Sequence, residues 1–345
     1  MSDAPNGPGP RAQPGEASPA IPFGDRLSAA VAERESQVVL GIDPDPALLW
    51  PAALEGLAES RARLVMALAD VERSVALDYG QGGRTARLEA AAGVLAHCHD
   101  LVDAAGPACV AVKPQLACFE RLGFPGWLAL EATVVHARNQ GLLVIADAKR
   151  GDVPGSAYAY AQAVFGGIGT PHGDSQGLGA DAVTLNPLLG RDSLAPFVEA
   201  AGALGTGVFV LVRSSNQGAG DLFDAELAAG GALWELIARL VSAAGAPGHD
   251  SGLAHVGAVC GATAPQHLAR MRELMPHSPF LLPGIGAQGG AVADLAPAFA
   301  PGRAGGLVSA SRSIAGAHET GTAGPAEAAR AAAERLREEA WALAS

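Results

Sequence analysis

The chain has 345 residues, of which 49% are apolar, and it carries a formal charge of −12. Its length fits one α/β barrel with insertions, and its apolar fraction is enough for a large core. The negative charge argues against a nucleic-acid-binding face, and no apolar run approaches the roughly 20 residues of a membrane span. We therefore expect neither nucleic acid nor a membrane as a partner.

The termini and cysteines predict a cytoplasmic location. Residues 1–22 hold six prolines and several glycines, which is typical of a disordered tail, and residues 23–345 are expected to form one domain. No apolar stretch of the signal-peptide type stands at the start. Free thiols in a reducing compartment are expected because no C-x-x-C spacing links the four cysteines, which are Cys98, Cys109, Cys118 and Cys260.

Apolar runs alternate with helical patterns along the chain. The helical patterns cover residues 55–104 (interrupted at 79–83), 125–140, 192–203, 222–244, 264–274, 289–299 and a last helix from Pro325, and a Gly-rich loop at 166–177 is placed away from the site. The eight strand candidates are residues 38–44, 109–114, 142–150, 182–186, 207–212, 256–260, 280–282 and 306–309. Eight such units predict parallel strands in a closed (β/α)8 TIM barrel.

The third strand candidate is the most informative stretch. It ends in Asp147 and Lys149, and Asp152 follows the strand-breaking Gly151. Because residues i and i+2 of a strand share a face, Asp147 and Lys149 are expected to point the same way. Charges at the end of an apolar strand are costly unless they pair. This stretch alone is compatible with either a structural ion pair or a functional site.

Polar residues also follow the other strand candidates, where barrels carry their chemistry. They are Asp43 after strand 1, Lys113 after strand 2, Ser214, Ser215 and Asn216 after strand 5, residues 283–290 after strand 7 and residues 311–313 after strand 8. The last two loops form a recurrent phosphate site in barrels. There, Gly286 and Gly289 allow close approach to an anion, Gln288 offers an amide, and Arg312 offers a fork of donors. The pattern predicts a phosphate site.

These segments resemble the orotidine 5′-phosphate decarboxylase family in its longer bacterial form, type 2. The match is specific because the D-x-K-x-x-D segment 147–152 occurs together with the K-P-Q segment 113–115. The matching segments run in family order over roughly residues 23–315, and they are 41–44, 112–115, 147–152, 180–184, 215–216, 259–263, 283–290 and 311–312.

The resemblance implies conversion of orotidine 5′-phosphate to UMP and CO2 in de novo pyrimidine biosynthesis, without metal or organic cofactor. Lys149 matches the lysine that protonates C6 of the pyrimidine, and Asp147 matches the carboxylate that faces the substrate carboxylate. Asp43 and Lys113 match the outer members of an acid–base network. A fixed ammonium beside C6 would stabilise the developing carbanion and then supply the proton, while carboxylates keep that lysine charged.

The resemblance also implies a homodimer with shared active sites. Asp152 matches an aspartate supplied to the neighbouring subunit, and Ser156 stands where that subunit usually supplies a threonine. Ser215, with Asn216 beside it, matches the residue that reads the pyrimidine amide. The phosphate grip is matched by Gln288 and Arg312, with Gly286 and Gly289 in the same loop. Residues 186–190, Ser214 and Gln217 depart from the family pattern, which affects contacts to the base rather than the ionic network.

Two other functions remain open. One is a related barrel decarboxylase or aldolase that acts on a sugar phosphate with Mg²⁺, but such an enzyme needs further acidic ligands. The other is a non-catalytic barrel that only binds a phosphate ligand, against which the intact lysine–acid set argues. The run His97-Cys98-His99 could suggest a metal, but it lies in a helical pattern without further ligands at the right spacing, so we expect none there.

Overall fold

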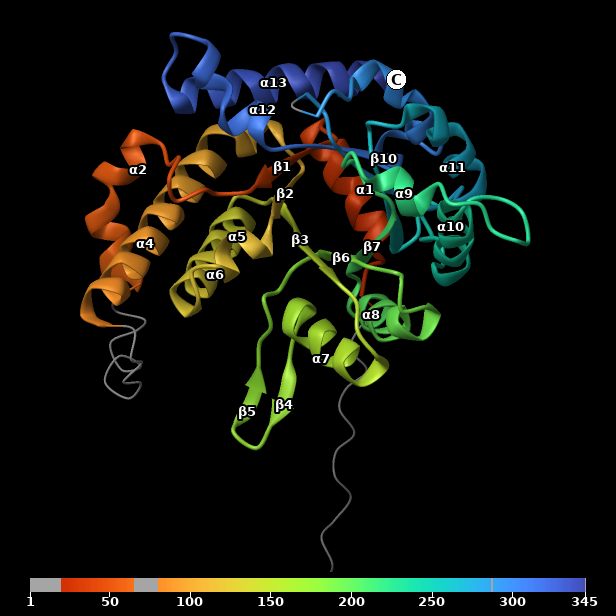
Figure 1. Ribbon diagram of the computed structural model, residues 1–345, viewed down its shortest axis with the longest axis horizontal. Coiled ribbons are helices and arrows are strands. Elements are labelled where there is room, and N and C mark those ends of the chain that lie inside the picture. Colours follow the sequence, from red (N-terminus) through yellow and green to blue (C-terminus); the bar gives the residue numbers. More distant parts are fainter. Residues whose placement is uncertain (1–19, 65–79, 287, 345) are drawn as a thin grey trace, which may run out of the picture.

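A computed structural model describes residues 20–64, 80–286 and 288–344. Its centre is a closed barrel of parallel strands surrounded by helices (Figure 1), which confirms the predicted TIM barrel. Around the barrel the strands run in the order β1-β10-β9-β8-β7-β6-β3-β2, so the last strand in the chain closes on the first. The barrel strands are β1 (Val38–Ile42), β2 (Ala111–Pro114), β3 (Leu143–Arg150), β6 (Ala182–Leu185), β7 (Gly207–Arg213), β8 (Val256–Cys260), β9 (Phe280–Pro283) and β10 (Gly306–Ala310).

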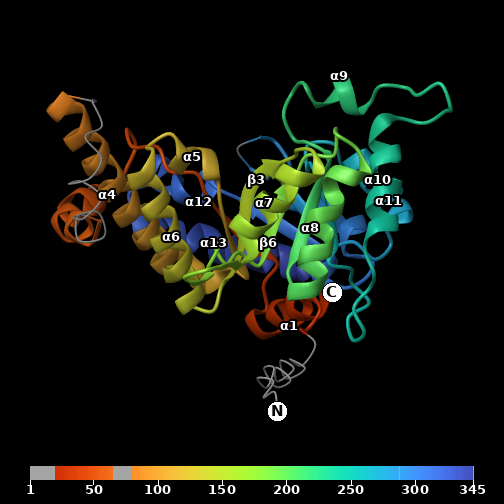
Figure 2. The ribbon, with the colours of Figure 1, turned by 90° about the horizontal axis from the view of Figure 1, so that it is seen from below.

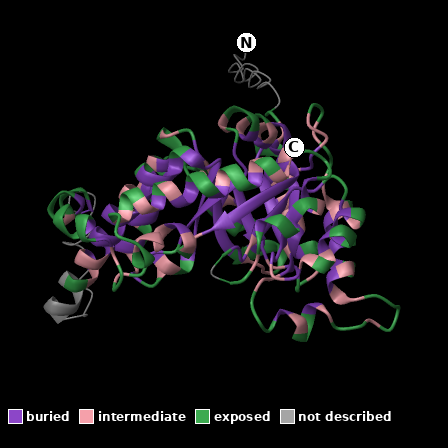
Figure 3. Cartoon of the chain, turned by 90° about the horizontal axis from the view of Figure 1, so that it is seen from above, coloured by how far each residue is buried: buried purple, intermediate pink, exposed green. Residues whose placement is uncertain are grey.

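Helices cover the outside of the barrel, and burial falls from the purple strands to the green outer faces of the helices (Figure 3). None of the described helices is long and apolar enough to cross a membrane. The α-helices are α1 (Phe23–Arg34), α2 (Pro51–Glu55), α4 (Gly80–Ala105), α5 (Leu116–Glu120), α6 (Phe124–Asn139), α7 (Pro154–Phe165), α8 (Arg191–Leu204), α9 (Ala219–Phe223), α10 (Leu233–Ala244), α11 (Leu268–Leu274), α12 (Arg312–Ala315) and α13 (Pro325–Leu343). The 3-10 helices are η1 (Gly106–Ala108), η2 (Pro265–His267), η3 (Val292–Phe299), η4 (Arg303–Gly305) and η5 (Ala317–Thr320).

Alternation along each strand divides the core into two parts. In β1, Val38, Leu40 and Ile42 pack against the helix layer, whereas Val39 points into the barrel. Both faces are fully buried, which explains why these strands read as nearly unbroken apolar runs. The inward set comprises Val39, Ala111, Ile145, Ala182, Phe209, Val259, Leu281 and Leu307.

Helix α1 closes one end of the barrel. Phe23, Leu27 and Val31 are each 1% exposed and pack on the inward-facing set. Phe23 meets Phe209 edge-on with ring centroids 6.1 Å apart, and a Cβ at Gly207 would lie 2.4 Å from the Phe23 ring. Figure 2 shows α1 at the opposite end of the barrel from α9, which follows β7. The barrel is therefore plugged at the amino ends of its strands.

The helical pattern over residues 222–244 was too long as a prediction. The chain forms two helices there, α9 and α10, because the turn between them contains Gly230 and Gly231 at φ +86° and +82°. Both glycines adopt a left-handed conformation that an α-helix cannot contain. The pattern at 289–299 is likewise not an α-helix but the 3-10 helix η3, which includes Pro297.

Three further segments refine the predicted organisation. The expected loop at 166–177 is an antiparallel hairpin of β4 (Ile168–Thr170) and β5 (Gly173–Ser175), between α7 and the start of β6. The expected interruption at 79–83 is wrong for Gly80–Gly83, which belong to the start of α4, while Tyr79 lies outside the described residues. Residues 1–19 of the predicted tail also lie outside the described part of the chain. All four cysteines are free, as expected.

Candidate active site

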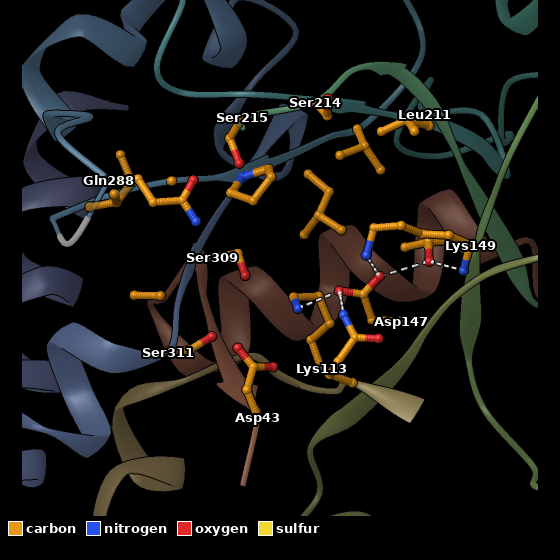
Figure 4. A pocket seen from close by; sticks show the side chains of 18 of the residues that line it. Asp43, Lys113, Asp147, Lys149, Leu211, Ser214, Ser215, Gln288, Ser309 and Ser311 are labelled. Carbon is orange, nitrogen blue, oxygen red and sulfur yellow. Dashed lines mark hydrogen bonds and ion pairs between the residues drawn. The ribbon is translucent and has the colours of Figure 1, made fainter. Parts of the chain in front are cut away.

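The open end of the barrel carries buried polar side chains at positions that continue the inward alternation. Lys113 and Asp147 are each 6% exposed, and Thr184 is 1% exposed. They line a cavity of about 250 Å³ (Figure 4). Seven of the predicted site residues meet there, and these are Asp43, Lys113, Asp147, Lys149, Ser215, Gln288 and Arg312. The expectation that strand ends bring these distant residues together is therefore met for the larger part of the set.

Asp147 is the centre of the ionic network. Its Oδ2 accepts hydrogen bonds from Lys113 Nζ at 2.7 Å and from Gln115 Nε2 at 3.3 Å. Its Oδ1 accepts from Lys149 Nζ at 2.6 Å and from Thr184 Oγ1 at 2.9 Å. Each oxygen thus has two donors. A buried carboxylate needs such partners because the solvation lost on burial must be replaced.

Lys113 and Asp147 hold each other charged. Burial by itself would raise the pKa of Asp147, but the ammonium groups of Lys113 and Lys149 outweigh burial and lower it well below its usual value. Burial by itself would lower the pKa of Lys113, but the charges of Asp147 and Asp43 raise it above its usual value. Opposite charges within a few ångströms favour the ionised forms. The mouth therefore contains a fixed cation–anion–cation chain.

Lys149 adopts an unusual backbone conformation. Its φ of +46° lies in the left-handed region, which costs a non-glycine residue roughly 1–3 kcal/mol. The register explains why, since Ala146 pairs with Val183 and Arg150 pairs with Leu185. Three residues of β3, numbers 147 to 149, therefore lie opposite Thr184 alone. The sequence pattern predicted that regular alternation brings Lys149 to the same face as Asp147. The side chain of Lys149 instead reaches Asp147 from a bulge.

Asp43 joins the network through its charge. It is exposed just after β1 and lies near Lys113 (Figure 4), whose pKa it helps to raise. Among the described residues, no ion pair within 4 Å includes Asp43. Ser311 lies close beside it because Gly41 has no side chain: a Cβ there would lie 1.8 Å from Ser311 Oγ.

The predicted phosphate loop lies across the cavity from the lysines. Gly286 and Gly289 have φ of +72° and +91°, and the Gly289 N–H donates to the Gly286 carbonyl at 2.8 Å. These two glycines do not line the cavity itself, whereas Gln288 and Arg312 do. Arg312 is exposed, and within the described ranges no ion pair includes it. Its guanidinium remains available to an anion.

A second hollow adjoins the cavity beside that loop. Asn216 lies there with Lys149, Ser215, Gln288 and Arg312. Ser214 Oγ donates to Asn216 Oδ1 at 2.5 Å, which holds the amide in place. The structure thus brings Asn216 to the rim and not into the main cavity.

Asp152 and Ser156 do not line the cavity of their own chain. Asp152 is half-buried after β3, where its Oδ1 accepts from the Val153 N–H at 2.7 Å, and Ser156 is exposed in the first turn of α7. The unusual segment 186–190 also lies outside the cavity, and its Leu188 and Leu189 are 54% and 49% exposed.

Two residues that contact Asp147 were not predicted as site residues. Thr184 and Gln115 stand inside the matching sequence segments, but their contacts with Asp147 depend on how neighbouring strands pair. A simpler signal was in the composition: Lys113 and Lys149 are the only two lysines in the chain, and both lie in this site. Apart from these two lysines, all Lys and Arg positions of the chain are arginine.

The histidine run in α4 has a packing role. The Trp50 N–H donates to His97 Nδ1 at 3.2 Å, and His99 stacks on His136 with centroids 4.1 Å apart. Burial and the charge of His318 lower the pKa of His97 to about 4. Within the described ranges, no group of three or more histidine, cysteine or acidic residues is arranged to hold a metal ion.

Comparison with known proteins gives one consistent result. Residues 69–332 match the orotidine 5′-phosphate decarboxylase / HUMPS family. The chain is 37% identical over 298 residues to an orotidine 5′-phosphate decarboxylase of Rhodopirellula baltica, covering 86% of this chain and 89% of that protein. It is 45% identical over 240 residues to one of Deinococcus radiodurans, covering 70% and 82%. The structure of Leishmania donovani OMP decarboxylase superposes with a TM-score of 0.65 at 29% identity, covering 94% and 99%.

Proposed function

This chain belongs to the orotidine 5′-phosphate decarboxylase / HUMPS family, and from that premise we propose how its barrel mouth decarboxylates orotidine 5′-phosphate to UMP and CO2 in pyrimidine biosynthesis. The observation that carries the proposal is the Lys113–Asp147–Lys149 chain, joined at 2.7 and 2.6 Å in one cavity. The reaction uses these charges without a metal or an organic cofactor.

Lys149 is the proton donor in this proposal. When the C6–carboxylate bond breaks, CO2 leaves and the electron pair stays on C6, where no conjugated electron sink is available. An ammonium held beside that carbon stabilises the pair and then transfers its proton to C6, which yields UMP and a neutral lysine. The Lys149 side chain is 43% exposed toward the cavity, so its Nζ can reach a bound ligand.

Asp147, Lys113 and Asp43 determine the electrostatic field around the Lys149 ammonium. Asp147 stays ionised because both of its oxygens are saturated with donors, and it faces the substrate carboxylate as that group departs. Lys113 and Asp43 continue the alternation of charge away from Lys149. Preorganised charges of this kind need little rearrangement during the reaction.

The rest of the cavity binds the nucleotide. Gln288, which lies across the cavity from the lysines (Figure 4), and Arg312 hold the phosphate. Gly286 and Gly289 shape the loop that carries Gln288. Ser215 and Asn216 read the pyrimidine amide from the rim. Phosphate binding energy aligns the base with Lys149, although the phosphate is remote from the bond that breaks.

The direct test is the loss of orotidine 5′-phosphate absorbance when the purified protein is added, with UMP identified as the product. Decarboxylation should continue in EDTA. A protein that is active on a sugar phosphate, inactive on orotidine 5′-phosphate and silenced by EDTA would instead be the magnesium-dependent relative. A protein that binds UMP without turnover would be a binding barrel.

The same proposal includes a homodimer in which Asp152 and Ser156 complete the partner's site. Support comes from their place outside their own cavity, beside exposed apolar side chains. Val153 and Tyr158 are 58% and 57% exposed, and residue 151 approaches the backbone of Asn186, which leads to the exposed Leu188. An exposed apolar surface of this kind suits a two-fold interface.

Mixing two inactive variants tests the shared site. Lys149→Ala and Asp152→Ala chains would form one intact site in each mixed dimer, and random exchange makes about half of the dimers mixed. About a quarter of wild-type activity should therefore return. A mixture that stays inactive after confirmed subunit exchange would place Asp152 in its own chain's site.

A further inference from the structure

Thr184 donates to Asp147 and also makes a second hydrogen bond, to the backbone of Lys149, that the ionic network does not require. It is the single residue of β6 opposite residues 147 to 149 of β3, and it is 1% exposed. Its Oγ1 accepts the Lys149 backbone N–H at 2.9 Å and donates to Asp147 Oδ1 at 2.9 Å. One hydroxyl thus joins the backbone of the lysine to the side chain of the aspartate.

The bulge makes this hydroxyl necessary. Because three residues of one strand face a single residue of its neighbour, the strand register leaves the Lys149 N–H without the backbone partner that a regular ladder would give. This N–H is partly shielded from water and therefore needs an acceptor, which the side chain of Thr184 supplies. The same bond holds Lys149 at φ +46°, from which its Nζ reaches Asp147 Oδ1 at 2.6 Å.

We infer that Thr184 is a positioning residue for the reaction: it fixes the strained bulge that aims the Lys149 ammonium and, through its second hydrogen bond, orients the Asp147 carboxylate. This inference rests on the proposed function, since Lys149 matters to chemistry only if it is the proton donor. Thr184 acts through Lys149 and Asp147 and does not itself react.

The test compares Thr184→Val, which keeps the shape and removes the hydroxyl, with Thr184→Ser, which keeps the hydroxyl. Misplacing a reacting group by about 1 Å costs about 10²-fold in rate. We expect Thr184→Val to lose about this much in kcat, with KM for orotidine 5′-phosphate and the affinity for UMP changed less than about threefold. Thr184→Ser should keep kcat within about fivefold of wild type. The control is Thr133→Val, a buried threonine of α6 whose hydroxyl donates to the Ala129 carbonyl.

A second measurement tests the hydrogen bond from the Lys149 N–H to Thr184 independently of enzyme activity. Labelling with [15N]lysine gives only two backbone amide signals, from Lys113 and Lys149, because the chain has no other lysine. In Thr184→Val the Lys149 amide should exchange with solvent at least about tenfold faster, while Lys113 in β2 serves as the reference. A general loss of stability would accelerate both signals.

The outcomes separate the two proposals. An inactive wild-type protein would overturn the proposed function, while the exchange rates would still test the hydrogen bond. An active wild type with unchanged kcat or unchanged Lys149 exchange in Thr184→Val would overturn the role of Thr184. If the valine variant does not fold, Thr184→Ser and Thr184→Ala decide, and equal losses in kcat for both would overturn the inference.

Discussion

Two buried cations in this chain are stabilised in opposite ways. Lys113, inside the barrel mouth, bonds to a carboxylate, and the charges of Asp147 and Asp43 overcome burial and raise its pKa. Arg272, outside the barrel in α11, is 8% exposed and stacks over the Phe280 ring at 3.7 Å. Its partners are four backbone carbonyls, those of Met275, Ser278, Ala298 and Gly305. Burial lowers its pKa to about 10.

The difference separates a charge that lies at a ligand-accessible cavity from a charge that only holds chain segments together. Carbonyl dipoles accept from both terminal nitrogens of Arg272 but place no opposite charge beside it. These bonds tie together chain segments that lie outside the barrel. The carboxylates beside Lys113 create a field inside a cavity that a ligand can enter. Burial is similar in the two regions, so the arrangement of partners and the access to a ligand separate their roles.

The largest expected effect is the loss of chemistry in Lys149→Ala. Removing the proposed proton donor and its charge should lower kcat by about 10⁴-fold or more. UMP affinity should change little, since the predicted phosphate loop lies across the cavity. Single-turnover decarboxylation and calorimetric UMP binding measure the two quantities. A rate within tenfold of wild type would remove Lys149 from the mechanism.

Arg272→Met should affect folding and leave chemistry intact. The substitution removes the Arg272 donors from four buried carbonyls, so the free energy of unfolding should fall by roughly 2–5 kcal/mol. The kcat of the folded enzyme should stay within about twofold, because Arg272 lies outside the barrel. Denaturant melts and active-site-normalised rates check this prediction.

The matched control for this change is Arg270→Met on the same helix. Arg270 is exposed and pairs with Glu235 and Glu273, and exposed ion pairs contribute about 0–1 kcal/mol. Equal destabilisation by the two substitutions would contradict the structural role assigned to Arg272.

Arg312→Ala tests a cation of the mouth that has no acidic partner among the described residues. Loss of a charge-assisted pair with the phosphate is worth roughly 1.5–3 kcal/mol, so kcat/KM should fall about ten- to 150-fold. Added guanidinium should restore part of this loss. An unchanged kcat/KM would exclude Arg312 from the phosphate site, and failure of rescue would weaken the charge explanation.

The smallest effect concerns His97, a buried group that stays neutral. Because its folded pKa of about 4 lies below the ordinary value of 6.5, the unfolded chain takes up the proton first as pH falls. Stability should therefore decrease as pH falls through 6.5 toward 4, with a loss of about 2 kcal/mol between pH 7 and 5 from this group. Asparagine can offer an acceptor to the Trp50 N–H without titrating.

Chemical melts of wild type and His97→Asn at several pH values measure this contribution. The difference in unfolding free energy between the two proteins should grow with pH from 5 to 7. A difference that does not vary with pH would show that His97 is not protonated preferentially in the unfolded chain.

The barrel was predictable because both faces of its strands are buried, which leaves apolar runs such as 256–260 that local composition reveals. The placement of charged residues at the carboxyl ends of the strands could also be predicted, because these residues directly follow the apolar runs in the sequence. The break between α9 and α10 was missed because apolar residues continue on both sides of Gly230 and Gly231, and the pattern outweighed the glycines. Local periodicity therefore located elements better than it located their ends.

The site was predictable in its charges and not in its geometry. Alternation placed Asp147 and Lys149 on one face, and their contact is present, but it depends on a bulge. That bulge depends on a hydroxyl 35 residues further along the chain, at Thr184, which no local pattern connects to Lys149. Hydrogen bonds between strands become visible only when the register is known.

The restriction of lysine to the cavity has a practical consequence for protein chemistry. The lysine amines of the chain are limited to two side chains, and the Lys113 side chain is 7% exposed whereas the Lys149 side chain is 43% exposed. An acylating reagent would therefore find Lys149 as its accessible side-chain amine, and UMP would shield it. Mass spectrometry would then report occupied cavities as the fraction of chains in which Lys149 stays unmodified, and attachment to a support through Lys149 would block the cavity.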